Sequence, residues 1–159
     1  MVTWQVAGSA TDLTEPVHKT LRDFIVAHWT ETNPPAASIR FKLDWYVGYG
    51  SYQIHFKDSQ TPVSVITLGF GYREYKEYVN IHIFVRTNVT QEPVQRDNIK
   101  KEIQRIVSDY KDQLVLAGQV KTSYMEVMNM VNENQSSEEA NIWHTIITVC
   151  IVYWKIAGP

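Results

Sequence analysis

Histidine is the residue type in this chain with the widest chemistry, and two of the five histidines occupy suggestive positions. His55 and His82 lie in segments that read as β-strands, where they could meet across a sheet together with Asp44. Two imidazoles and one carboxylate can bind a transition metal. The other interpretation treats them as ordinary residues on the solvent side of strands, and we adopt it because sequence does not fix strand register. We therefore predict no metal site.

No other pattern of residues predicts catalysis. The single cysteine, Cys150, lies within the apolar run Ile146–Val152, where burial would raise its pKa and leave the thiol unreactive. Gly69-Phe70-Gly71 follows a strand-like segment, but it lacks the third glycine and the helix that a dinucleotide site requires. We expect no catalytic residue, no cofactor and no enzymatic activity.

Length and composition indicate one soluble domain. The chain has 159 residues, which suits a single domain over 1–159 with its own core. Its formal net charge of −2 provides no basic excess for binding a phosphate backbone, so we expect no sequence-specific nucleic-acid partner. We expect no leader peptide, because the first residues, Met1–Gln5, carry neither a charged leader nor an apolar run. We expect no membrane partner, because the most apolar window, Ile142–Ile156, is short and contains polar residues.

Hydrophobic periodicity in the first half predicts one helix and then four strands. Apolar residues recur at helical spacing over Glu15–Thr30, so this segment is expected to form an amphipathic helix that buries Leu21. Alternating patterns follow with short connections between them, which favours an antiparallel meander. The four strands are expected at 39–47, 52–57, 63–70 and 78–87.

The second half predicts a further helix and a closing hairpin. A stripe from Ile99 to Leu114, with Ile103 at its centre and Gly118 as a C-cap, indicates the helix. The segment 123–131 could be helix or strand, and we interpret it as a strand because it precedes the strand Ile142–Ile156. The predicted fold class is α+β, with a mostly antiparallel sheet packed against two helices.

Aromatic residues are abundant, with five Trp, nine Tyr and five Phe. Tyr49, Tyr72 and Tyr75 fall on turns and polar positions of the predicted meander, where a tyrosine suits a protein interface. Cross-strand pairing that stabilises the sheet would use the same residues, so both interpretations stay open.

The polar stretch Asn132–Ala140 contains three acidic residues, Glu133, Glu138 and Glu139. We predict that it forms a mobile arm outside the sheet, which docks on a basic patch of a neighbouring subunit. A solvated loop without a partner is the alternative.

The order of the elements resembles that of tail-terminator and tail-completion proteins of tailed phages. The similarity covers most of the chain and rests on pattern: the first helix, the strand Val79–Arg86, the helix with Ile99, Ile103 and Ile106, and the closing hairpin. It implies a virion structural protein without a cofactor, which forms a ring, typically a hexamer, at the tail end or head–tail junction. The implied partners are further copies of the chain, the tail tube and the head-side connector. The implied locations are the virion and, during assembly, the host cytoplasm.

The resemblance does not distinguish a terminator from a head-completion or tube subunit. A second class also fits the pattern, namely a small-molecule-binding or enzymatic α+β domain with an aromatic-lined pocket. A closed cavity with a polar group at its base would indicate that class.

Overall fold

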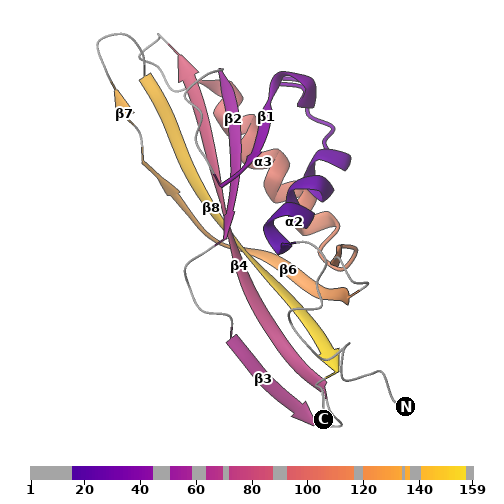
Figure 1. Ribbon diagram of the computed structural model, residues 1–159. Coiled ribbons are helices and arrows are strands. Elements are labelled where there is room, and N and C mark those ends of the chain that lie inside the picture. Colours follow the sequence, from indigo (N-terminus) through magenta and orange to yellow (C-terminus); the bar gives the residue numbers. More distant parts are fainter. Residues whose placement is uncertain are drawn as a thin grey trace.

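The described residues form a mixed, mostly antiparallel β-sheet with the helices α2 and α3 on one of its faces (Figure 1). This confirms the α+β class. The computed structural model describes residues 16–44, 51–58, 64–69, 72–87, 93–116, 120–133, 135–136 and 141–156.

Within these residues the strands form one sheet of eight, in the order β1-β2-β4-β8-β6-β5. β3 pairs with β4 and β7 pairs with β8 outside this path. The strands are β1 (Arg40–Leu43), β2 (Tyr52–Asp58), β3 (Ser64–Gly69), β4 (Tyr72–Thr87), β5 (Val115–Leu116), β6 (Val120–Asn132), β7 (Gln135–Ser136) and β8 (Asn141–Ile156).

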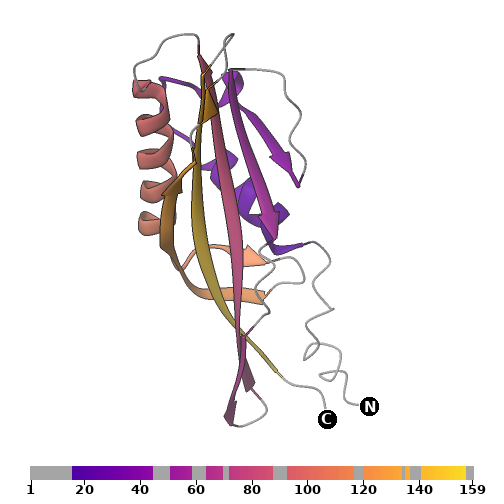
Figure 2. The ribbon, with the colours of Figure 1, turned by 90° about the vertical axis from the view of Figure 1, so that its left-hand side faces the viewer.

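The sheet is built around β4 and β8, which pair antiparallel along their whole length. The register runs from Tyr72 opposite Ile156 to Thr87 opposite Asn141, and each strand has 16 residues. At about 3.3 Å per residue each strand is roughly 50 Å long. Figures 1 and 2 show that one end of this pair, together with β3, extends beyond both helices. We call this end the ribbon, meaning residues 64–69, 72–78 and 150–156.

The helices α2 (Val17–Ala27) and α3 (Val94–Asp109) cover the same face of the sheet (Figure 1). A short 3₁₀ helix, η2 (Ala36–Ser38), follows α2. Leu21 of α2 and Ile103 of α3 are fully buried, as the periodicity predicted. None of the helices in the described part of the chain is long and apolar enough to cross a membrane.

Alternation along the strands places aliphatic side chains beneath the helices. We call this side of the sheet the covered face. Its buried residues include Ile54, Phe56, Val79, Ile81, Ile83, Val85, Ile147, Val149 and Ile151.

A charged pair ties the helices together. Glu102 is buried on α3 and accepts hydrogen bonds from the Thr30 N–H at 2.8 Å and from Arg105 Nη2 at 2.6 Å. Burial raises the pKa of Glu102, but the bonds from Arg105 and Thr30 outweigh it, so the pKa is lowered. Arg105 also donates to the carbonyl of His28, and this fixes the segment after α2 against α3.

The predicted four-strand meander is wrong in its pairing. β1 and β2 are parallel, with Arg40 opposite Gln53. Asp44 ends β1 with a φ of 63°, and its N–H donates to the carbonyl of Phe56 at 3.1 Å. A left-handed φ does not continue a strand, so β1 ends at Leu43, before the predicted end at residue 47.

β2 and β3 also do not pair with each other. β2 pairs with residues 79–85 of β4, and β3 pairs with residues 72–76. Because β4 is 16 residues long, it holds both strands end to end along one side. β4 begins at Tyr72, six residues before the predicted strand start, in a segment that the prediction left between the third and fourth strands.

Several expected boundaries also change. α2 begins at Val17, with the extended Pro16 as its N-cap, and the predicted cap Thr14 lies outside the described residues. α3 ends at Asp109, earlier than predicted, and a turn leads to the buried Leu114. Gly118 lies outside the described residues. The uncertain segment 123–131 is a strand, within β6, and the final apolar run is the strand β8.

Candidate interaction surfaces

The side of the sheet away from both helices, the outer face, carries a mixture of polar and apolar side chains. It is defined by the alternation of β2, β4 and β8 relative to the covered face. Its residues are Gln53, His55, Lys57, Glu74, Lys76, Tyr78, Asn80, His82, Phe84, His144, Ile146, Thr148, Cys150, Val152 and Trp154. Neighbouring β6 adds Tyr124, Glu126, Asn129 and Val131 at the same level.

Three histidines and a phenylalanine pack together on the outer face. His55 lies opposite His82 in the sheet register, as the sequence suggested. His82 Nδ1 and His144 Nε2 share a hydrogen bond of 2.9 Å, and the rings of His144 and Phe84 stack with centroids 4.2 Å apart. His55 Nε2 lies 3.1 Å from Gln53 Oε1. We call these residues the imidazole cluster.

No helix of the described residues covers the imidazole cluster, yet His55 is 0% exposed and His144 is buried, while His82 and Phe84 are half-buried. Burial and the charges of Lys57 and Lys42 lower the pKa of His55 to about 4. Burial, Lys57 and His144 lower the pKa of His82 to about 4 as well. The pKa of His144 is also lowered by burial, with Glu133 acting in the opposite direction. His55 and His82 are therefore uncharged at neutral pH.

The third member of the suggested metal ligand set lies elsewhere. Asp44 is at the end of β1, where its Oδ2 is 3.2 Å from Nε2 of His18 on α2. Nδ1 of His18 is 2.9 Å from Oδ1 of Asp58. Within the described ranges, no group of three or more His, Cys, Asp or Glu side chains is placed to hold a metal ion. The considered combination of His55, His82 and Asp44 therefore does not form.

Cys150 has the environment that the sequence predicted. It is buried on the outer face beside Tyr78 and Glu126, and burial raises the pKa of its thiol. A buried, protonated thiol is a poor nucleophile.

The ribbon carries aromatic residues on both faces. Tyr75 and Tyr153 stack with ring centroids 5.2 Å apart, and the Tyr153 hydroxyl donates to Glu77 Oε1 at 3.1 Å. On the outer face the Trp154 side chain is 52% exposed, and its Nε1–H donates to Glu74 Oε2 at 2.9 Å. The hydrogen bond fixes the indole while leaving much of its apolar surface in solvent.

Of the three tyrosines predicted at an interface, the structure describes the side chain of Tyr75 only. Tyr75 is only 5% exposed, so the expectation that it lies on the solvent side is wrong. Its strand begins at Tyr72, and this places Tyr75 on the side of the stacked Tyr153. The side chain of Tyr72 and the whole of Tyr49 lie outside the described residues, so their interface role stays a prediction.

The acidic stretch also differs in part from expectation. Glu133 is exposed, and its N–H donates to the carbonyl of His144 at 2.7 Å. Gln135 and Ser136 pair with Ile142 and Asn141, so this part of the stretch belongs to the sheet and the predicted separation from it is wrong. Backbone hydrogen bonds hold Gln135 and Ser136 in a strand, although the stretch has no large apolar side chain to bury. Glu138 and Glu139 lie outside the described residues.

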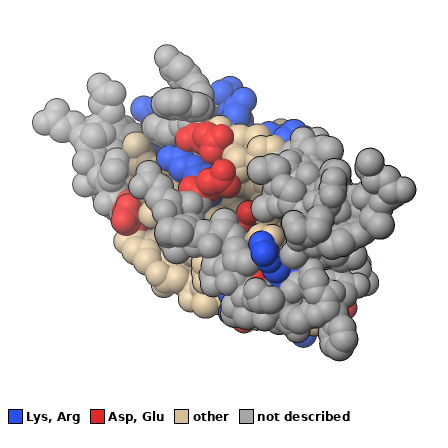
Figure 3. Space-filling model, turned by 60° about the horizontal axis from the view of Figure 1, so that its bottom comes forward, with Lys and Arg blue, Asp and Glu red and all other residues tan. Residues whose placement is uncertain are grey.

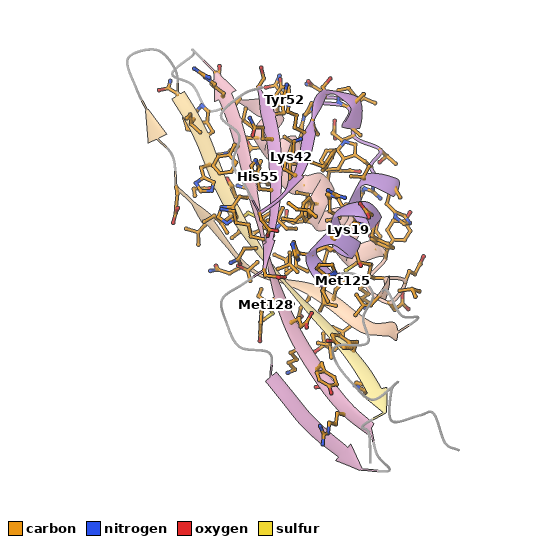
Figure 4. All side chains as sticks on the ribbon, viewed as in Figure 1. Lys19, Lys42, Tyr52, His55, Met125 and Met128 are labelled. Carbon is orange, nitrogen blue, oxygen red and sulfur yellow. The ribbon has the colours of Figure 1, made fainter. Side chains whose placement is uncertain are left out.

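β6 presents exposed apolar side chains along its length. Tyr124, Met128 and Val131 are all exposed. The strand has register shifts between Thr122 and Tyr124 and between Val127 and Asn129, which mark bulges. Figure 4 shows Met125 on the side of the helices and Met128 on the opposite side, in agreement with the burial of Met125 and the 52% exposure of Met128.

A groove of about 280 Å³ separates α3 from β6. Its floor is apolar, with Val107 and Met125 buried, and polar side chains such as Ser108, Lys111 and Glu126 form the rim. Val127 and Gln104 complete the lining, so none of its residues is aromatic. We call it the α3–β6 groove. The sequence did not reveal it, because the groove depends on where α3 crosses the edge of the sheet.

Charges of both signs alternate along the ribbon, where Arg73 and Lys76 lie beside Glu74 and Glu77. Figure 3 shows acidic and basic side chains interspersed among the described residues at this end of the molecule. Such a mixed surface gives no single field that would attract a phosphate backbone.

Comparisons with known proteins give a likeness in fold only. No family model matches the chain, and no curated protein matches its sequence. A chain from the virion of a native gene transfer agent particle is 11% identical, with a TM-score of 0.43 and coverage of 95% of this chain and 99% of that one. A second solved protein, without a descriptive name, has the same identity and TM-score and coverage of 90% and 95%.

Proposed function

We propose that this chain is a virion structural protein, which acts through protein–protein contacts and not through catalysis or a cofactor. In the proposal it associates with copies of itself into a closed ring, such as a hexamer, at the tail end or the head–tail junction. Its further partners are the tail tube and the head-side connector. It resides in the virion and, during assembly, in the host cytoplasm.

The ribbon is the observation that carries this proposal. Several ribbon residues of β8 are buried, including Ile151, Val152 and Tyr153, so the surface that the ribbon offers to a partner is the exposed part around Trp154. The ribbon extends beyond both helices and exposes Trp154, a residue type that often anchors protein interfaces (Figure 1). Exposed Tyr124, Met128 and Val131 continue the apolar surface along β6.

The remaining arguments are electrostatic and comparative. Mixed charges on the ribbon suit a protein partner better than a nucleic acid. The order of elements resembles tail-terminator and tail-completion proteins, and this is the source of the proposed position in a particle. The likeness to the gene transfer agent chain is too low to add weight. The α3–β6 groove lacks aromatic residues, so it differs from the pocket expected of a small-molecule-binding domain.

Light scattering and negative-stain microscopy of the purified chain test the proposal. We expect the wild-type chain to form rings in a concentration-dependent way and Trp154→Ser to abolish them. The urea midpoint of this variant should stay nearly unchanged, because the Trp154 side chain is half exposed. Lys42→Ser, a change at an exposed residue of β1 far from the ribbon, is the matched control and should assemble normally. A wild-type chain that remains monomeric at hundreds of micromolar, both alone and in the presence of tail-tube protein, would reject the proposal.

A further inference from the structure

The two edges of the sheet differ in how well they are protected against pairing with another strand. An edge strand exposes unpaired N–H and C=O groups, and proteins protect such edges with bulges, charged residues or covering segments. At one edge, β6 has a bulge between Thr122 and Tyr124, and the carbonyl of Lys111 accepts the Met125 N–H at 2.9 Å. This contact closes the edge of β6 at Met125. A second bulge lies beyond Val127, so the register is regular from Met125 to Val127.

Beyond Met125 the edge of β6 has no hydrogen-bonding partner strand among the described residues. Val127 lies two residues further along, so its N–H and C=O point to the same side as those of Met125. No strand in the described ranges pairs with this side of β6 at Val127. Val127 also lines the α3–β6 groove. An extended segment paired at Val127 would therefore place one of its side chains over an apolar floor.

The opposite edge of the sheet carries a strand that could pair with β6 of another copy. β3 has the sequence Ser-Val-Ile-Thr-Leu-Gly, with no charged residue and no proline, and only one of its sides pairs with a described strand. β1 is a poorer candidate, because its four residues include exposed Arg40 and Lys42. Among the described strands on that side, β3 is the longest without a charge.

We propose that β3 of one copy pairs with β6 of a second copy at Val127 and inserts an aliphatic side chain into the α3–β6 groove. The proposal rests on the proposed function, since it names the contact between neighbouring subunits of the ring. Each copy then offers β3 on one side of its sheet and the groove on the other. Such a heterologous contact can close into a ring, whereas a contact between identical patches gives only a dimer.

The position and charge of both partners fit this contact. β3 lies at the end of the molecule beyond both helices, where it can reach a neighbour without displacing either helix (Figure 1). The groove rim carries one cation, Lys111, and one anion, Glu126, so it has no net charge to oppose an uncharged strand. Val107 and Met125 provide the apolar contact.

Blocking the groove from the exposed side of α3 tests the inference without altering the core. Ser108→Trp fills the groove, and Gln104→Arg is a second variant on the same helix. Lys101→Trp is the matched control, because Lys101 is exposed on α3 and does not line the groove. We expect the ring fraction in light scattering to fall at least tenfold for the two groove variants. Lys101→Trp should assemble as the wild type does.

Cysteine pairing then tests which segment enters the groove. A Thr67→Cys chain mixed with a Ser108→Cys chain should form a disulfide-linked pair under mild oxidation, and neither variant alone should do so. The natural Cys150 is buried and should not compete. Lys101→Cys replaces Ser108→Cys in the control mixture and should give at least tenfold less product.

The outcomes separate this inference from the proposed function. Rings that form normally with Ser108→Trp but not with Trp154→Ser would overturn the β3–β6 contact and leave the proposed function standing. Loss of rings with Ser108→Trp but no disulfide in the mixture would overturn β3 as the inserted segment. A wild-type chain that never assembles would overturn both proposals.

Discussion

The covered face and the outer face of the same sheet bury residues of different kinds. Beneath the helices, Ile81, Ile83 and Ile147 are fully buried and have no polar group to satisfy. On the outer face the buried residues include imidazoles, and side chains form hydrogen-bonded pairs such as Thr148 with Asn80. The covered face thus supplies non-directional apolar stabilisation, while the outer face depends on specific pairings and on pH. Three predictions test this difference.

The largest expected effect is on the covered side. Ile103→Ala should lower the free energy of unfolding by about 2–5 kcal/mol, because Ile103 is fully buried and the substitution leaves a cavity between α3 and the sheet. Urea denaturation measures the change. Lys101→Ala, two residues away and exposed, is the control and should change the stability by less than about 0.5 kcal/mol. A loss below that value for Ile103→Ala would contradict the packing of α3.

The second effect belongs to the outer face and depends on pH. An unfolded histidine titrates near pH 6.5, while the pKa of His55 in the fold is about 4. As the pH falls below 6.5, His55 becomes protonated in the unfolded chain but stays neutral in the folded one. The contribution of neutral His55 to the free energy of unfolding is therefore fully present above pH 6.5 and is lost as the pH falls toward 4. The loss from His55 should be roughly 3 kcal/mol, from about 1.36 kcal/mol per pKa unit.

Urea unfolding at several pH values between 7.5 and 4 checks this prediction. His55→Gln keeps an N–H donor for Gln53 and removes the titration, so the pH dependence should become shallower. Lys57→Met should act in the same direction but more weakly, because the charge of Lys57 helps to lower the pKa of both His55 and His82. A pH profile that is identical in His55→Gln and the wild type would show that His55 does not titrate as described.

The smallest effect concerns a single pair on the outer face. The Thr148 hydroxyl donates to Asn80 Oδ1 at 2.9 Å, and Thr148→Val removes that hydrogen bond at nearly constant volume. The free energy of unfolding should fall by about 0.5–1.5 kcal/mol. Thr148→Ser retains the hydroxyl and should keep the hydrogen bond, which double-mutant cycles with Asn80→Ala would detect. Equal stability of the Val variant and the wild type would mean that the pair contributes nothing.

Much of the fold follows from local pattern. Alternation located β2, the long apolar run located β8, and the burial of Leu21 and Ile103 followed from helical spacing. The parallel pairing of β1 with β2 was not predictable in this way, because a short connection between two strands favours antiparallel pairing. The first part of β4 was not predicted, because its strand conformation comes from pairing with β3 and β8 on its two sides.

The surfaces were less predictable than the fold. The meeting of His55 and His82 followed from alternation, but the participation of His144 required the register of β8 against β4. Tyr75 was expected at the surface, and it is buried against Tyr153 because of the same register. The α3–β6 groove combines residues of a helix and a strand whose relative placement no local pattern contains.

The full-length pairing of β4 with β8 has a consequence for folding. The residues it joins are far apart in the chain, from 54 positions for Thr87 and Asn141 to 84 for Tyr72 and Ile156. Topologies with such distant contacts fold slowly, since a long loop must close before any pairing forms. β8 follows every other described strand in the sequence, and it lies between β4 and β6. During synthesis β4 and β6 therefore keep unpaired edges until β8 leaves the ribosome. We expect the nascent chain to be most prone to aggregation in that interval.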